Sequence, residues 1–124
     1  MTTTTKTKLT IRLSDRSPIT IVKEDWPRIA SDSDHDGQVR CQANEEWWIN
    51  VRRHSDGRTV VYGAIESGPG GCPRGWHDKH AGYLLPAGCT DDDVVRAIRR
   101  IAGVINQPDM ADRVIADLPA EEIQ

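Results

Sequence analysis

The chain contains no phenylalanine, and its large aromatic surface comes mainly from four tryptophans, Trp26, Trp47, Trp48 and Trp76. It has no apolar run approaching the roughly 18 residues that a membrane helix requires. Residues 1–8 carry two positive charges but lack the apolar region and small-residue cleavage site of a secretory signal. We therefore expect a cytoplasmic protein with no membrane partner, in which the positions of the tryptophans matter.

The chain contains few cysteines, and their spacing is not typical of a disulfide framework. Cys41, Cys72 and Cys89 form an odd set without a C-x-x-C pair, which is untypical of a secreted disulfide scaffold or a zinc ribbon. At 124 residues the chain is long enough to bury a core without a disulfide or a metal. We expect reduced thiols and no cofactor.

Neither sign of charge dominates the chain. The formal net charge is -3, which argues against a broad electrostatic surface for nucleic acid. Hydrophobic residues make up 37% and charged residues 28% of the chain, close to the values of globular domains. A protein partner is therefore favoured over nucleic acid, and a homodimer is a further expectation.

Alternation of apolar and polar residues predicts strands at residues 8–13 and 19–22, after a disordered tail over residues 1–7. Asp25 is expected to cap a short helical turn with Trp26 and Pro27 in its first positions. Residues 31–37 are predicted to form an acidic loop, followed by a strand at 39–43. All of residues 8–124 are expected to belong to one domain.

The strongest hairpin signal lies between Trp47 and Glu66, where two alternating strands flank Ser55-Asp56-Gly57. With Asp56 and Gly57 as the central turn residues, Arg53 pairs with Val60 and Val51 pairs with Tyr62. That register places one set of side chains on the core face: Trp47, Ile49, Val51, Val60, Tyr62 and Ala64. It places another set on the outer face: Trp48, Asn50, Arg52, His54, Thr59, Val61 and Ile65.

The C-terminal third predicts two helices. Residues 67–82 are expected to form a long loop and 83–85 a short edge strand. Thr90 with Asp93 forms a capping-box start, and the apolar stripe of the first helix includes Val94, Ile98, Ile101 and Ile105. A second helix is predicted over 109–118, burying Met110, Val114 and Leu118. The fold class is therefore α+β, an antiparallel meander of about four to six strands with two C-terminal helices packed on one face.

Two sets of residues have the chemistry of metal ligands. Asp32, Asp34, Asp36 and Gly37 match the start of a calcium loop, but Ala43 stands where the bidentate glutamate belongs, so a solvated acidic turn is favoured. Cys72, His77, His80 and Cys89 are zinc-type ligands without the close cysteine pairs of a structural site, so unconnected loop residues are favoured. Neither set is assigned a metal.

The same loop supplies the residue types of a nucleophilic site, because Cys72 lies near His77, His80 and Asp78 in the sequence. Residues of one flexible loop do not preorganise one another well, and no diagnostic catalytic motif is present. We assign no catalytic residue. A small metal- or thiol-dependent enzyme using the region from Cys72 to Cys89 is the alternative function.

The predicted outer face of the hairpin combines Trp48 with Arg52 and His54, and the long loop adds Trp76. Tryptophan and arginine are favoured anchors of protein interfaces. These four residues are the candidate binding site of a non-enzymatic binding protein. If the helices or other elements cover this face as well, Trp48 belongs to the core instead.

Four segments together suggest a relationship: ITIVKEDWP at 19–27, VRRHSDGR at 51–58, AIRR at 97–100 and IADLPAEE at 115–122. The chain resembles small uncharacterised accessory (cargo) proteins encoded on proteobacterial integrative and conjugative mobile elements. Such cargo proteins often inhibit host defence or regulate the element. The resemblance therefore implies an anti-defence or regulatory binding protein, with no catalytic residues carried over.

Overall fold

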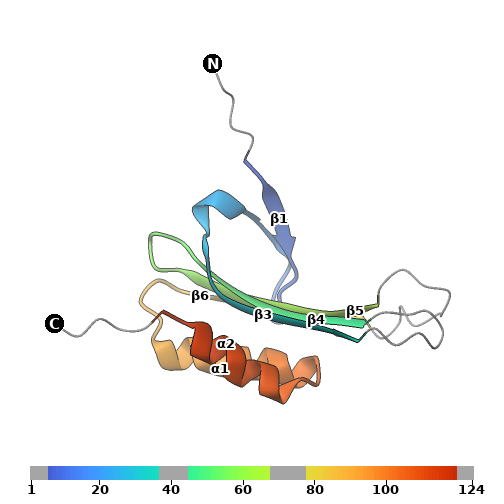
Figure 1. The fold of residues 1–124 in the computed structure, drawn as a ribbon. Helices are drawn as coiled ribbons and strands as arrows, with labels where there is room; N and C mark the ends of the chain where they lie inside the picture. The colour runs from blue at the N-terminus through green and yellow to red at the C-terminus, as the bar shows by residue number, and fades with distance from the viewer. Residues whose placement is uncertain (1–5, 37–44, 68–77, 120–124) are drawn as a thin grey trace.

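The computed structural model describes residues 6–36, 45–67 and 78–119. In these residues the chain forms two antiparallel sheets and two C-terminal helices, so the predicted α+β class is confirmed (Figure 1). The elements in chain order are β1 (Lys8–Ile11), β2 (Ile19–Val22), a 3-10 turn η1 (Lys23–Asp25), β3 (Arg28–Asp36), β4 (Glu45–Arg53), β5 (Thr59–Ser67), β6 (Lys79–Leu85), α1 (Asp91–Val104) and α2 (Pro108–Asp117).

The main sheet is a meander of four strands in the order β3-β4-β5-β6. Its central hairpin lies where the sequence predicts it, but the predicted register is wrong by one residue. Arg53 pairs with Thr59 and Val51 with Val61, because His54 bonds to the carbonyl of Arg58 and the loop keeps all three of Ser55, Asp56 and Gly57. Gly57 has a φ of +96°, which is typical of a three-residue hairpin loop.

The corrected register exchanges the faces of β5. Val61 and Ile65 now lie on the helix-facing side of the sheet, while Val60, Tyr62 and Ala64 lie on the outer face. Val60 and Val61 are both fully buried. Because both faces of this strand are covered, its apolar residues are continuous, and alternation does not reveal which of them faces the helices.

Both helices cover one face of the main sheet, as predicted (Figure 1). Thr90 and Asp93 form the predicted capping box of α1, with the Thr90 hydroxyl accepting from the Asp93 amide. Val94, Ile98 and Ile101 pack on the sheet, and Met110 and Val114 of α2 complete this core. Gly63 of β5 permits the close approach, since a Cβ there would lie 2.8 Å from Ile101 Cγ2.

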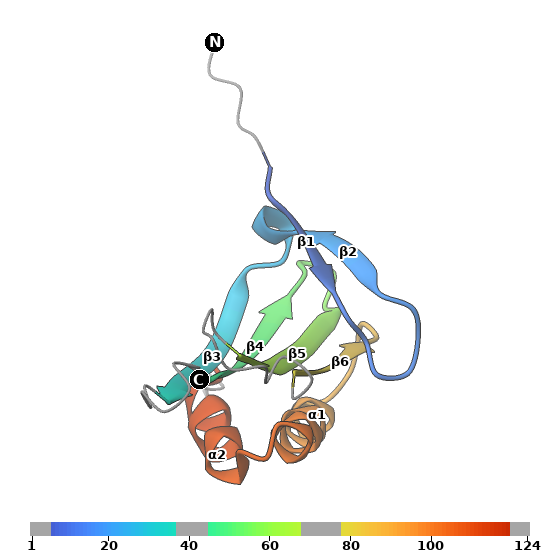
Figure 2. The same ribbon diagram turned by 90° about the vertical axis from the view of Figure 1, so that its right-hand side faces the viewer.

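The β1–β2 hairpin lies across the opposite, outer face of the main sheet (Figure 2). Its apolar side chains, Ile11 and Ile21, pack with Val60 and Tyr62 in a second core. The segment that follows β1 also contacts the edge strand β6, because Ser14 N donates to the Gly82 carbonyl and Gly82 N donates to Ser14 Oγ. The hairpin is thereby held over one part of the outer face.

Three local predictions need correction. Residues 31–36 are not a loop but the second half of β3, and Lys79 to Gly82 belong to β6 rather than to the long loop. The short turn before β3 spans Lys23–Asp25, so Trp26 follows it as a buried residue instead of starting it. The predicted strand at 39–43 lies outside the described residues.

Neither α1 nor α2, the helices of the described part of the chain, has the length and apolar character needed to cross a membrane.

Candidate functional site

Among the described residues, other elements cover the outer face of the main sheet only in part. The β1–β2 hairpin lies over one part of it (Figure 2), where Tyr62 packs in the second core. No described element covers the part around Ser33, Trp48, Glu66 and His80. We call this part the open face. Trp48 is its large aromatic residue, half-buried, and its ring meets Tyr62 edge-on with 5.5 Å between ring centroids. Trp48 therefore lies at the border between the second core and solvent.

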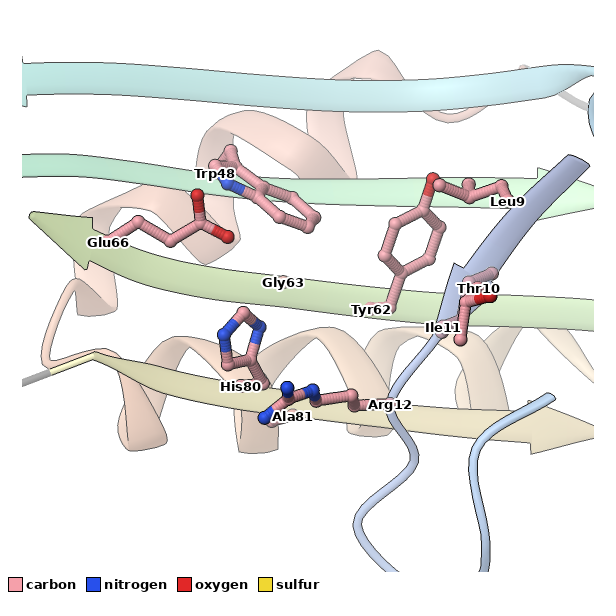
Figure 3. Close-up of a pocket in the computed structure, with 10 residues that line it drawn as sticks. All are labelled: Leu9, Thr10, Ile11, Arg12, Trp48, Tyr62, Gly63, Glu66, His80 and Ala81. Atoms are coloured by element: carbon pink, nitrogen blue, oxygen red, sulfur yellow. The ribbon is translucent and has the colours of Figure 1, made fainter. Parts of the chain in front are cut away.

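A hollow of about 220 Å³ lies between β1 and the open face. Residues 9–12 form one wall, and the side chains of Trp48, Glu66 and His80 surround the rest (Figure 3). Figure 3 shows Trp48 and Glu66 projecting from the neighbouring strands β4 and β5, with His80 and Arg12 above β6. The hollow thus combines an aromatic wall with a basic and an acidic group at its rim.

A second, shallower hollow of about 470 Å³ lies on the other side of Trp48. Polar side chains of β3 and β4 line it, including Arg28, Ser33 and Asn50. Arg28 Nη1 donates to Asn50 Oδ1 at 3.4 Å. Trp48 therefore forms a ridge with a depression on each side, an arrangement that lets a partner contact both sides of one indole ring.

Arg52, predicted as a binding residue, lies on the outer face but points into the covered part. Its Nε donates to the Tyr62 hydroxyl at 2.8 Å, and its Nη1 donates to the Trp26 carbonyl at 3.1 Å. The side chain is half-buried and joins β4, β5 and the segment before β3. In this position Arg52 stabilises the second core.

His54, the third predicted binding residue, lies at the turn end of the main sheet. It is about 20 Å along β4 from Trp48, from the rise per residue of a strand. Its ring meets Trp26 edge-on at 5.1 Å, and Nδ1 accepts from the Asp56 amide at 3.1 Å. The Asp56 carboxylate in turn accepts from the Arg58 amide, which lowers the pKa of Asp56. His54 therefore belongs to a turn cluster separate from the open face.

The acidic segment that matches the start of a calcium loop, and for which a solvated turn is predicted, belongs to the edge strand β3 as far as Asp36. Asp32 pairs with Ile49 in the β3–β4 ladder, and its carboxylate accepts from Arg113 Nε of α2 at 2.7 Å. That hydrogen bond raises the pKa of Arg113. Asp117 also accepts from the Ser31 amide, so acidic side chains serve to join β3 to α2. In residues 6–36, 45–67 and 78–119, no three His, Cys, Asp or Glu side chains come together as a metal site.

The predicted set of Cys72, His77, His80 and Cys89 is only half described. His80 lies on the open face at the start of β6, whereas Cys89 lies beyond the other end of β6 and packs with the helix-side core. The Cys89 thiol contacts the Thr59 hydroxyl at 3.8 Å. His80 and Cys89 are therefore not brought together. Cys41, Cys72, Trp76 and His77 lie outside the described residues.

Sequence reasoning missed Arg12 and Glu66 as neighbours of Trp48, and it found His80 for a different reason. Glu66 and Trp48 belong to the same predicted hairpin, and the observed register places both on one face of the sheet. Arg12 had no such signal, because the position of the β1–β2 hairpin above the sheet depends on contacts between residues distant in sequence.

Comparison with known proteins does not assign the chain to a family: no protein-family model matches it, and neither the curated proteins nor the solved structures yield a significant match. A function is therefore inferred from the open face.

Proposed function

We propose that the chain is a non-enzymatic binding protein that engages a protein partner through the open face, with Trp48 as the central anchor. Trp48 supports the proposal most directly, because a half-buried indole with a hollow on each side offers contact area on both of its flanks. Tryptophan is enriched among the residues that dominate binding energy at protein interfaces, particularly where polar groups surround it.

The polar surroundings of Trp48 favour protein over nucleic acid. Arg12 and Arg28 are accompanied by Glu66 close to the ring, and the chain as a whole has a net charge of -3. A strand of phosphates would meet the Glu66 carboxylate beside the stacking surface, at a cost in electrostatic energy. A mixed rim of acidic, basic and hydroxyl groups is instead typical of a protein interface.

The resemblance to cargo proteins of mobile elements supports a finer proposal within this class. A small accessory protein of a proteobacterial mobile element, acting in the cytoplasm, would bind a host defence protein or a regulator of the element. The alternative enzyme gains no specific support from the described residues, since His80 lies at the start of β6 and Cys89 lies beyond its other end.

Affinity co-purification from a proteobacterial lysate tests the proposal. The tagged wild type, Trp48→Ala and Glu66→Lys are compared, each with and without nuclease. Val104→Ala is the matched control, because Val104 is an apolar residue, 39% exposed, on α1 and away from the open face. We expect a stoichiometric protein that survives nuclease, is retained by Val104→Ala and is lost by Trp48→Ala. Glu66→Lys is expected to change the amount of partner retained, because it reverses a charge beside the Trp48 ring.

Each variant is also melted, because Trp48 packs on Tyr62 and its truncation is expected to cost about 1–2 kcal/mol of unfolding free energy. Glu66→Lys changes a half-buried rim residue and is expected to melt close to the wild type. A partner that all three variants retain equally would refute the open face as the binding site. A partner that nuclease treatment removes would indicate that the open face binds nucleic acid and not protein.

A further inference from the structure

We propose that the partner contributes an acidic, extended segment that adds to β1 as a third strand of the small sheet and places a side chain against Trp48. This inference rests on the proposed function and specifies the chemistry of its partner. Three independent features carry it: the unpaired edge of β1, the hollow beside that edge and the charge along it.

The pairing of β1 with β2 fixes the direction of its backbone groups. The register pairs Leu9 with Ile21 and Thr10 with Thr20, and Lys23 N donates to the Thr7 carbonyl at 2.9 Å. In an antiparallel ladder, alternate residues direct their N–H and C=O groups toward the partner strand. Thr7, Leu9 and Ile11 therefore face β2, whereas Lys8 and Thr10 direct their backbone groups away from it.

Figure 3 shows Trp48, Glu66 and His80 on this side of β1, so the outward groups are directed toward the open face. No described strand pairs with this edge of β1. A strand added here would lie about 4.8 Å from β1, and stacked sheets lie about 10 Å apart. The hollow of about 220 Å³ occupies that place, and Trp48 borders it on the sheet side. Alternate side chains of the added strand would point toward Trp48.

Each edge of the main sheet is occupied at one position by a contact from another element. Ser14 occupies both backbone groups of Gly82 on the outer edge of β6. Asp117 accepts from the Ser31 amide on the outer edge of β3. Exposed strand edges are templates for pairing with another chain, and natural proteins usually block them. The edge of β1 beside the hollow lacks a block of this kind and is therefore a suitable docking edge.

The charge along this edge selects an acidic segment. Lys8 and Arg12 are exposed and form no ion pair within the described part of the chain, whereas Lys6 lies 3.8 Å from Asp25. Residues 6–12 contain no acidic side chain. An acidic side chain on the outward side of an added strand would lie opposite Lys8, where a cross-strand pair of opposite charge is favourable. A second acidic side chain near the hollow would meet Arg12 above β6.

The same charges argue against a second copy of the chain. In the register that centres a twofold axis on Thr10, two β1 strands would bring Lys8 of each copy opposite Arg12 of the other, the residue that follows β1. Like charges directly opposite each other destabilise a strand pair. A heterologous acidic segment avoids this repulsion.

A displayed library of random nonapeptides provides the probe, selected against the full chain. We expect enriched peptides in which acidic and apolar residues alternate and proline is absent from the centre. The affinity of an enriched peptide is then measured for the wild type and for Thr10→Pro, which removes the outward N–H of β1. Thr20→Pro is the matched control, because Thr20 is the cross-strand partner of Thr10 and directs its N–H to the opposite edge.

We expect Thr10→Pro to weaken binding about tenfold or more, while Thr20→Pro binds like the wild type, with both variants melting together. Should Thr10→Pro fail to fold, the double variant Lys8→Glu with Arg12→Glu serves instead. We expect this variant to bind the acidic peptides weakly and to select basic peptides from the library. Equal loss with both proline variants, unchanged binding in the charge-reversed variant or a selection without enrichment would overturn the added strand. A wild-type dimer that Thr10→Pro dissociates would also overturn the proposal, because the edge of β1 would then pair with a second copy of the chain.

The two proposals fail separately. A lysate partner that depends on Trp48 but not on Thr10 would leave the open face as the binding site and remove the added strand. A partner that depends on neither residue would remove both.

Discussion

Replacing Arg52 with methionine measures how much this side chain, which the sequence suggests as a binding residue, contributes to the free energy of unfolding. Arg52 donates to the Tyr62 hydroxyl at 2.8 Å and to the Trp26 carbonyl at 3.1 Å, and both acceptors belong to buried residues. Hydrogen bonds with a charged group contribute about 1.5–3 kcal/mol each when buried. Methionine retains the packing of the aliphatic stem but supplies no donor.

The half-buried position of Arg52 places each bond at or somewhat below the low end of that range, so we expect a total loss of about 2–3 kcal/mol of unfolding free energy. For a domain of this size, 1 kcal/mol lowers Tm by roughly 4 °C, which gives a decrease of about 10 °C. Thermal melts and urea unfolding followed by circular dichroism measure both quantities. Arg96→Met is the control, because Arg96 is exposed and lies 3.9 Å from Asp93, so it is expected to change stability by less than about 0.5 kcal/mol.

Tyr62→Phe provides the second half of a double-mutant cycle. It removes the acceptor of Arg52 Nε while leaving the ring that packs on Trp48. If the bond is formed, the two substitutions together cost less than the sum of their separate effects, by about 1 kcal/mol. Arg52→Met melting within about 2 °C of the wild type would refute the structural role and return Arg52 to the candidate binding residues.

Two further perturbations test the packing of the main sheet and its helix cap. Gly63→Ala is expected to destabilise the domain by about 1–3 kcal/mol in urea unfolding, because the added Cβ would lie 2.6 Å from the Trp48 carbonyl oxygen; a variant as stable as the wild type would contradict this contact. The Asp93 carboxylate accepts from the Thr90 amide, and this hydrogen bond lowers the pKa of Asp93 below its ordinary value of 3.8. The stability that the ionised carboxylate contributes is therefore present above pH 3.8 and is lost as the pH falls through the folded-state pKa. The urea midpoint of Asp93→Asn should therefore fall less on acidification than that of the wild type, and parallel acid profiles would contradict the cap.

Local signals predicted much of the fold. Three predicted features depend only on residues that lie close together in the sequence: the capping box at Thr90, the apolar stripe of α1, and the strands β1 and β2. Such patterns act through intrinsic preference and periodicity, which a single sequence contains. The order β3-β4-β5-β6 also follows chain order, so neighbouring segments pair with each other.

The hairpin register depends on information that periodicity does not contain. Val60, Val61 and Tyr62 are all buried, because helices cover one face of β5 and the β1–β2 hairpin covers the other. Either register would bury apolar residues, so the loop geometry decides. The loop closes with Gly57 at positive φ and His54 bonded to Arg58, which moves β5 by one residue relative to the two-residue alternative.

The candidate site was predictable only in part. Trp48 was found from its residue type and strand position, and it does lie on the outer face. The role of Arg52 depends on the Trp26 carbonyl, which lies 26 positions earlier in the chain. The acidic segment at Asp32 resembled a loop by composition, but pairing with Ile49 and an ion pair with Arg113 stabilise it as a strand. Such long-range contacts leave no local pattern in the sequence.

The role of the open face is tested most directly by amide hydrogen exchange of the full chain, free and in the complex captured from lysate. We expect the partner to protect the amides of Lys8 and Thr10 and those around Trp48, while exchange in α1 and α2 stays unchanged. Protection confined to the exposed side of the helices, with unchanged exchange at β1 and Trp48, would contradict a binding site on the open face.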